Sequence, residues 1–198
     1  MNGLYLKARW IGNRWLILVN VALLSMLTLH SLQNPSGSNT TLLGNDGPKE
    51  AAAYYLLGGD AASFGPETKE LVQLNKAFSP DVLSIAKGST IAFPNKDSFT
   101  HNVYSPEGVE GFFDLGSAGT TDAGNSNLIQ RAFPMEGVIK VSCAVHPIMK
   151  AHIFIVPSKY HTASKDGSYT FTDVPAGTYD LMVVTGSGKP EKMKSVTF

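Results

Sequence analysis

The chain has 198 residues, of which 43% are hydrophobic, so it can bury one sizeable core and has room for a small second module. Its 16 basic residues equal its 16 acidic residues, and no basic cluster is interleaved with aromatic residues, which excludes nucleic acid as the expected partner. A single cysteine excludes a disulfide within the chain.

The first 30 residues are typical of an export segment. Lys7, Arg9 and Arg14 supply a positive region, and an uncharged run follows over residues 15–29. This run is shorter than the roughly 20 residues that usually cross a bilayer, but no small-residue cleavage site follows it. Residues 1–30 are therefore either a cleaved signal peptide or a membrane anchor. Both alternatives place the rest of the chain in the periplasm or another extracytoplasmic space.

Residues 31–70 are rich in Gly, Pro, Asn and Ser, which is the composition of a linker. Within this stretch, residues 49–57 are compatible with a short helix whose tyrosines and leucines dock on the neighbouring domain. Nothing in the stretch suggests chemistry, so it is interpreted as a tether.

From about residue 71 the sequence changes to short runs of period-two alternation, each ended by turn residues. Strands are expected over residues 82–86, 90–93, 100–104, 138–143 and 151–156. The Gly-rich stretch 107–127 is expected to be irregular. The pattern predicts an all-β domain over residues 71–157.

One loop of this domain carries three soft ligands at three-residue intervals. Alternation in the strand 138–143 places Cys143 on the core side, and His146 and Met149 follow before the next strand. His101, on a distant strand, supplies a second imidazole. Thiolate, imidazole and thioether suit copper better than magnesium or calcium, which prefer oxygen ligands. The spacing therefore predicts a mononuclear copper site, with His101, Cys143 and His146 in a trigonal set and Met149 in an axial position.

Each of these residues has an ordinary explanation when taken alone. A lone inward cysteine is usually a small buried hydrophobe, a lone histidine is usually a hydrogen-bonded polar residue, and a lone methionine usually fills a core. Their joint spacing is what favours a site. Of the other histidines, His152 is expected on the outer face of its strand and His161 in solvent, and His30 would matter only as a new N-terminus.

Residues 72–156 resemble the cupredoxins, and most closely the group of amicyanin, pseudoazurin and plastocyanin. The resemblance is carried by residues 78–80, 87–97, 100–103, 113–116 and the loop 143–149. It implies a Greek-key β-sandwich with one type 1 copper ion, held by His101, Cys143, His146 and Met149. It also implies that Asn102 ties the two ligand loops together by hydrogen bonds. The ring edge of His146 would be the electron exit, within an apolar patch.

Residues 158–198 resemble the latter half of the carboxypeptidase regulatory-like, or transthyretin-like, β module. Alternation predicts two strands there, joined by a turn at residues 174–177. In that family the module is structural, so it is expected to pack on the cupredoxin domain or add strands to it. The sequence therefore divides into 1–30 (signal peptide or anchor), 31–70 (linker), 71–157 (cupredoxin domain) and 158–198 (C-terminal β extension).

The expected function is one-electron transfer between a donor and an acceptor redox protein, without enzymatic activity. A copper storage or chaperone module is the alternative. A larger copper enzyme would need paired histidines, whereas the five histidines here are spread singly. A zinc site is disfavoured by Met149, because zinc commonly takes nitrogen, thiolate or carboxylate ligands. The sequence does not fix the redox partners or the oligomeric state.

Overall fold

The computed structural model describes residues 10–11, 14–15, 40–119 and 128–198. Every regular element in these residues is a strand, which confirms the all-β class. Trp10–Ile11 (β1) and Arg14–Trp15 (β2) form an antiparallel pair in a separate unit, Met1–Gly37. The rest of the expected export segment lies outside the described residues. Among the residues that are described, no helix is long and apolar enough to cross a membrane.

The first part of the larger unit is a two-sheet sandwich. Its strands are Thr68–Glu70 (β5), Val72–Leu74 (β6), Ala77–Ser79 (β7), Val82–Ala86 (β8), Thr90–Phe93 (β9), His101–Ser105 (β10), Phe113–Ala118 (β11), Ile129–Ala132 (β12), Gly137–Ser142 (β13) and Lys150–Val156 (β14). One sheet has the order β11-β10-β13-β14-β8 and the other β12-β9-β5, while β6 and β7 form a hairpin. The chain crosses between the sheets from β8 to β9, β9 to β10, β11 to β12 and β12 to β13, as expected of a Greek-key sandwich.

Alternation along the strands builds the core of this sandwich as predicted. In β13, Ile139 and Val141 enter the core between the two sheets, whereas Val138 faces the other way. Ile139 lies opposite Ile153 of the antiparallel neighbour β14, and both side chains are fully buried. At the turn from β8 to β9, Gly88 has a φ of +85°, a left-handed conformation that favours glycine.

A second sandwich combines the C-terminal strands with two strands from the expected linker. Its strands are Thr40–Gly44 (β3), Ala52–Leu57 (β4), His161–Ser164 (β15), Tyr169–Val174 (β16), Thr178–Thr185 (β17) and Pro190–Thr197 (β18). One sheet has the order β15-β4-β17-β18, and β16 pairs with β3. The predicted strands β16 and β17 exist, but they pair with β3 and β4 rather than with each other. The likeness to a transthyretin-like module stays a prediction.

The linker interpretation is wrong for residues 40–57, and so is the short helix over 49–57. Five of the six residues of β4 are buried. Tyr54 packs into the core of the second sandwich, and the adjacent Tyr55 packs into a core between the two sandwiches. A strand that is buried on both faces is a continuous apolar run without alternation, which explains why the sequence did not distinguish it from a helix.

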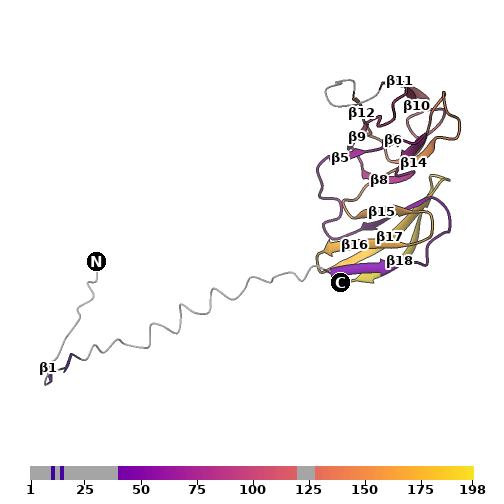
Figure 1. Cartoon of the computed structure of the whole chain (residues 1–198). Helices are drawn as coiled ribbons and strands as arrows, with labels where there is room; N and C mark the ends of the chain where they lie inside the picture. The colour runs from indigo at the N-terminus through magenta and orange to yellow at the C-terminus, as the bar shows by residue number, and fades with distance from the viewer. Residues whose placement is uncertain (1–9, 12–13, 16–39, 120–127) are drawn as a thin grey trace. The chain divides into compact units, whose positions relative to one another are not determined.

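The sheets of the larger unit form four stacked layers (Figure 1). The first two layers are the sheets of the first sandwich. Phe154 and Val156, on the outer face of the second layer, pack against Tyr55 and Val184 of the third layer. The β16–β3 pair covers the far side of the third layer through Tyr169 and Phe171. The second sandwich therefore covers one face of the first.

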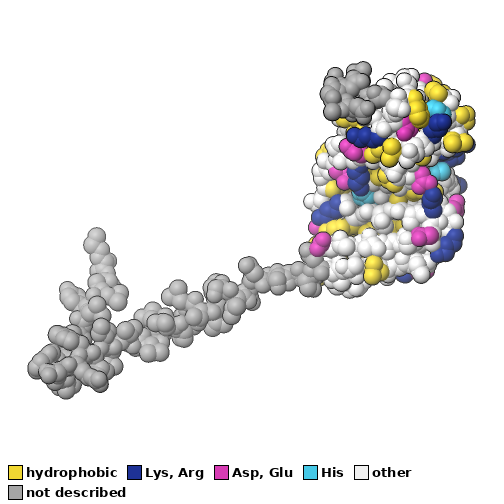
Figure 2. All heavy atoms as spheres, viewed as in Figure 1, with side chains coloured by type: hydrophobic (Ala, Val, Ile, Leu, Met, Phe, Trp, Pro, Cys, Tyr) yellow, Lys and Arg dark blue, Asp and Glu magenta, His cyan; other side chains and the backbone are white. Residues whose placement is uncertain are grey.

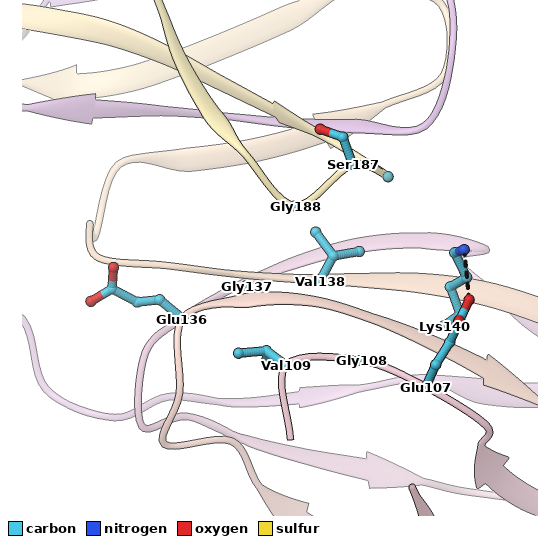
Figure 3. Close-up of a pocket in the computed structure, with 10 residues that line it drawn as sticks. Glu107, Gly108, Val109, Glu136, Gly137, Val138, Lys140, Ser187 and Gly188 are labelled. Atoms are coloured by element: carbon cyan, nitrogen blue, oxygen red, sulfur yellow. Dashed lines mark hydrogen bonds and ion pairs between the residues drawn. The ribbon is translucent and has the colours of Figure 1, made fainter. Parts of the chain in front are cut away.

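The Gly-rich stretch 107–127 is less irregular than predicted, because β11 lies within it and pairs with β10. Residues 120–127 of that stretch lie outside the described residues. A cavity of about 440 Å³ lies between this stretch and the β17–β18 turn, with Val109 and Val138 in its wall (Figure 3). Its charged side chains are already paired, Lys140 with Glu107 at 2.9 Å and Glu136 with Lys87 at 3.0 Å, so the cavity offers no unpaired charge to a ligand.

Candidate metal centre

The structure brings three of the four predicted ligands together at one end of the first sandwich. His101 is the first residue of β10, Cys143 directly follows β13, and His146 lies in the loop before β14. Nδ1 of His101 lies 3.1 Å from Nδ1 of His146. Sγ of Cys143 lies 3.9 Å from the first of these nitrogens and 4.0 Å from the second. In the described ranges, these three residues are the group of His, Cys, Asp and Glu side chains that is arranged to hold a metal ion.

The triangle formed by these three atoms has the size that a metal ion requires. A point equidistant from atoms separated by 3.1, 3.9 and 4.0 Å lies about 2.1 Å from each of them. Metal–nitrogen and metal–sulfur bonds of a first-row ion such as zinc are about 2.0 to 2.3 Å long. One ion therefore fits among the three donors, and the soft donor set selects copper over magnesium or calcium.

Burial around the three donors is uneven. His101 is fully buried and Cys143 is 1% exposed, which confirms that the thiol points inward. His146 is only partly buried and leads from the cluster to the surface. Val145 and Ile148, which flank it, are 57% and 80% exposed. In Figure 2, hydrophobic side chains gather beside a histidine over the part of the body that carries β10 and β14.

Met149 lies at the end of the same loop and is buried in the core that contains Cys143. Its N–H donates to the carbonyl oxygen of His146 at 2.9 Å, and its own carbonyl oxygen accepts from the N–H of Cys143 at 3.3 Å. These bonds close the loop into a compact turn. Backbone hydrogen bonds therefore help to hold the loop in this geometry.

Asn102 joins the strand of His101 to the loop of Cys143. Its backbone N–H points to Sγ of Cys143 at 3.4 Å, and its side-chain Oδ1 accepts from the N–H of Ala144 at 3.2 Å. Its Nδ2 donates to Asp114 at 2.8 Å. These contacts confirm the predicted tie between the two ligand segments. An N–H in this position would stabilise a thiolate that binds a metal ion.

Asp97 is a functional neighbour that sequence reasoning missed. Nε2 of His101 lies 2.7 Å from Oδ2 of Asp97, and the carboxylate also accepts from the backbone N–H groups of Asn75 and Lys76. Burial alone would raise the pKa of Asp97, but the N–H of Lys76, the ring of His101 and the N–H of Asn75 together hold that pKa below its ordinary value. The carboxyl is therefore an ionised acceptor at neutral pH.

Electrostatics also favour a neutral His146. Desolvation lowers the pKa of its ring, and the neighbouring His101 and Lys76 lower it further, while Asp97 acts in the opposite direction. A metal ion binds the unprotonated imidazole. A lowered pKa therefore leaves His146 ready to act as a ligand near neutral pH.

Two other histidines lie outside the cluster. His152 stacks on Phe154, with ring centroids 6.2 Å apart, on the outer face of β14 as predicted. The expectation that His161 is solvated is wrong. Its ring is buried between Ser84, whose Oγ lies 2.9 Å from Nδ1, and Glu67, whose Oε1 lies 3.1 Å from Nε2.

Comparisons with family models and with curated proteins found no match, whereas solved structures do match. A proline-to-glycine mutant of amicyanin in its reduced Cu(I) form is 18% identical, with a TM-score of 0.40, over 48% of this chain and 90% of that one. A purple cupredoxin from Nitrosopumilus maritimus is 25% identical, with a TM-score of 0.37, over 45% of this chain and 99% of that one. A methionine-to-leucine mutant of oxidised amicyanin is 15% identical, with a TM-score of 0.40, over 59% of this chain and 98% of that one. The likeness extends over about half of this chain, and the site is assigned from its own geometry.

Proposed function

We propose that this protein holds one type 1 copper ion and carries single electrons between two redox proteins. The observation that carries the proposal is the triangle of two imidazole nitrogens and one cysteine sulfur, whose size matches a single metal ion. When bound, copper supplies a one-electron couple between Cu(II) and Cu(I). His101, Cys143 and His146 would hold it, with Met149 as a weak axial ligand.

The residues around the triangle suit a site that changes charge without changing shape. The hydrogen bond from Ala144 to Asn102 and the turn that ends at Met149 hold the donors in place before an ion arrives. Burial of His101 and Cys143 keeps water away from the inner side. Such pre-organisation lowers the structural change that each electron transfer requires.

The partly exposed ring of His146 is the proposed route for electrons. It is flanked by the exposed Val145 and Ile148 and by Phe99, whose ring centroid lies 5.5 Å from that of His146. An apolar surface of this kind suits short-lived contacts with a donor and an acceptor protein. The proposal includes export to the periplasm or another extracytoplasmic space, where copper would also protect the single thiol from oxidation.

Copper storage or delivery is the alternative function. The enclosed position of Cys143 and His101 favours electron transfer, because release of the ion to another protein would require the buried donors to exchange ligands. The two functions differ in spectroscopy. A type 1 centre has an intense visible thiolate-to-Cu(II) band and a reversible voltammogram, whereas a storage site binds copper without them.

The test is the visible and paramagnetic-resonance spectrum of the copper-loaded protein and of three variants. Cys143→Ser should remove the visible band from a folded protein, and Met149→Leu should retain the band with a shifted reduction potential. His152→Gln is the matched control, because His152 lies on the outer face of β14 and should leave the band unchanged. A wild-type protein that binds copper without the band, or a Cys143→Ser protein that keeps it, would refute the proposal.

A further inference from the structure

Three N–H donors converge on the carboxylate of Asp97. Nε2 of His101 lies 2.7 Å from Oδ2, the N–H of Lys76 donates to the same oxygen at 3.0 Å, and the N–H of Asn75 donates to Oδ1 at 2.7 Å. The side chain of Asp97 is nearly buried, and that of His101 is fully buried. This carboxylate therefore sits directly behind a predicted ligand, on the side away from the cluster.

The contact fixes which nitrogen of His101 carries the proton. A carboxylate can only accept hydrogen bonds, so Nε2 must be the donor, and in the neutral ring Nδ1 then carries the lone pair. Nδ1 is the nitrogen that faces Cys143 and His146. Asp97 thus sets both the orientation and the tautomer of the ring in the form that binding at Nδ1 requires.

The same carboxylate holds the β6–β7 hairpin against the site. Asn75 and Lys76, the two residues of its turn, have φ values of 55° and 56°, as in the two-residue hairpin turns with positive φ at both positions. Nζ of Lys76 lies 5.4 Å from the centroid of the Phe99 ring, and that ring is 5.1 Å from the ring of His101. The hairpin turn therefore borders the apolar surface around His146.

We propose that Asp97 is a positioning residue that sets the reduction potential and the metal affinity of the copper site through His101. It also links the Asn75–Lys76 turn to that ligand. This inference rests on the proposed function, because it takes His101 to be a copper ligand. A carboxylate behind an imidazole makes the free nitrogen a stronger donor, which favours Cu(II) over Cu(I) and lowers the reduction potential. Changes in such outer partners typically alter metal affinity about 10- to 100-fold.

Asp97→Asn is the informative variant, because it removes the charge and retains an oxygen that accepts from the hairpin. The Cu(II)-to-Cu(I) affinity ratio should fall at least about tenfold, which raises the reduction potential by about 59 mV. Asp114→Asn is the matched control. It also removes a charge near the site, but Asp114 contacts Asn102 rather than a ligand, so its shift should be less than half as large.

A second readout needs no metal. In the copper-free protein, two-bond proton–nitrogen spectra should place the proton of His101 on Nε2, whereas a proton on Nδ1 would overturn the inference. Equal potential shifts in the two variants, or none in Asp97→Asn, would also overturn it while leaving the copper site intact. If the wild-type protein lacks the visible band, the proposed function fails instead, and the tautomer alone then decides whether Asp97 positions His101.

Discussion

Acid should destabilise the copper-free protein through His161, which lies between the two sandwiches. Its side chain is 3% exposed, its Nδ1 accepts from Ser84, and its Nε2 donates to Glu67. Burial lowers the pKa of His161 from 6.5 to about 4, and the charge of Lys69 adds to this effect, while Glu67 opposes it. At neutral pH the ring is therefore neutral, and its contact with Glu67 is a hydrogen bond to a carboxylate rather than an ion pair.

The sign and size of the effect follow from these pKa values. In the unfolded chain His161 takes up a proton below pH 6.5, whereas in the folded protein it does so only near pH 4. The stabilisation is thus complete above pH 6.5 and is lost as the pH falls towards 4. The difference between the two pKa values corresponds to about 3 kcal/mol of unfolding free energy.

The assay is denaturant unfolding of the copper-free protein at pH 7 and pH 4, for the wild type and for His161→Gln. Glutamine can still accept from Ser84 and donate to Glu67, but it does not titrate. The variant should therefore lose about 3 kcal/mol less than the wild type between the two pH values. Removing copper keeps acid-driven loss of the metal out of the measurement, and protonation of the free ligands affects the wild type and the variant alike. Equal losses in the two proteins would refute the assignment of this acid sensitivity to His161.

Two further predictions concern stability at neutral pH, and both are measured by denaturant unfolding. Asn102→Ala should cost about 1 to 3 kcal/mol, because it leaves the N–H of Ala144 without its acceptor, and an unchanged midpoint would contradict the tie between the ligand segments. Phe154→Ala should cost about 3 to 5 kcal/mol, because it opens a cavity between the second and third layers. Phe112→Ala is its control, since Phe112 is 69% exposed, and similar costs for the two would refute the layered packing.

The cluster was predictable from sequence because its donors are chemically distinctive and closely spaced. Three of them lie within seven residues, and strand alternation shows which side of β13 Cys143 faces. Asp97 was not predictable, since an aspartate in a turn is ordinary. Its role depends on the β6–β7 hairpin, which reaches this turn through a bridge between Gln73 and Asn95. The residues next to Asp97 in the sequence therefore do not reveal that contact.

The second sandwich was harder to predict for two reasons. The run that forms β4 lacks alternation because both of its faces are buried, so the periodicity that identifies other strands is absent. Its partners β15 and β17 lie more than one hundred residues further along the chain. The burial of His161 also depends on Glu67 from a remote loop. Long-range pairing of this kind leaves no signal in a short sequence window.

The second sandwich separates the start of the larger unit from the candidate metal centre. Thr40, where the larger unit's first strand begins, lies in the fourth layer, whereas the metal donors border the core between the first and second layers. Stacked sheets lie about 10 Å apart, so roughly 20 Å or more of packed protein separates the two positions. Under the proposed function, a redox partner that binds at the edge of His146 would therefore stay clear of Thr40, the residue at which the larger unit begins its first strand.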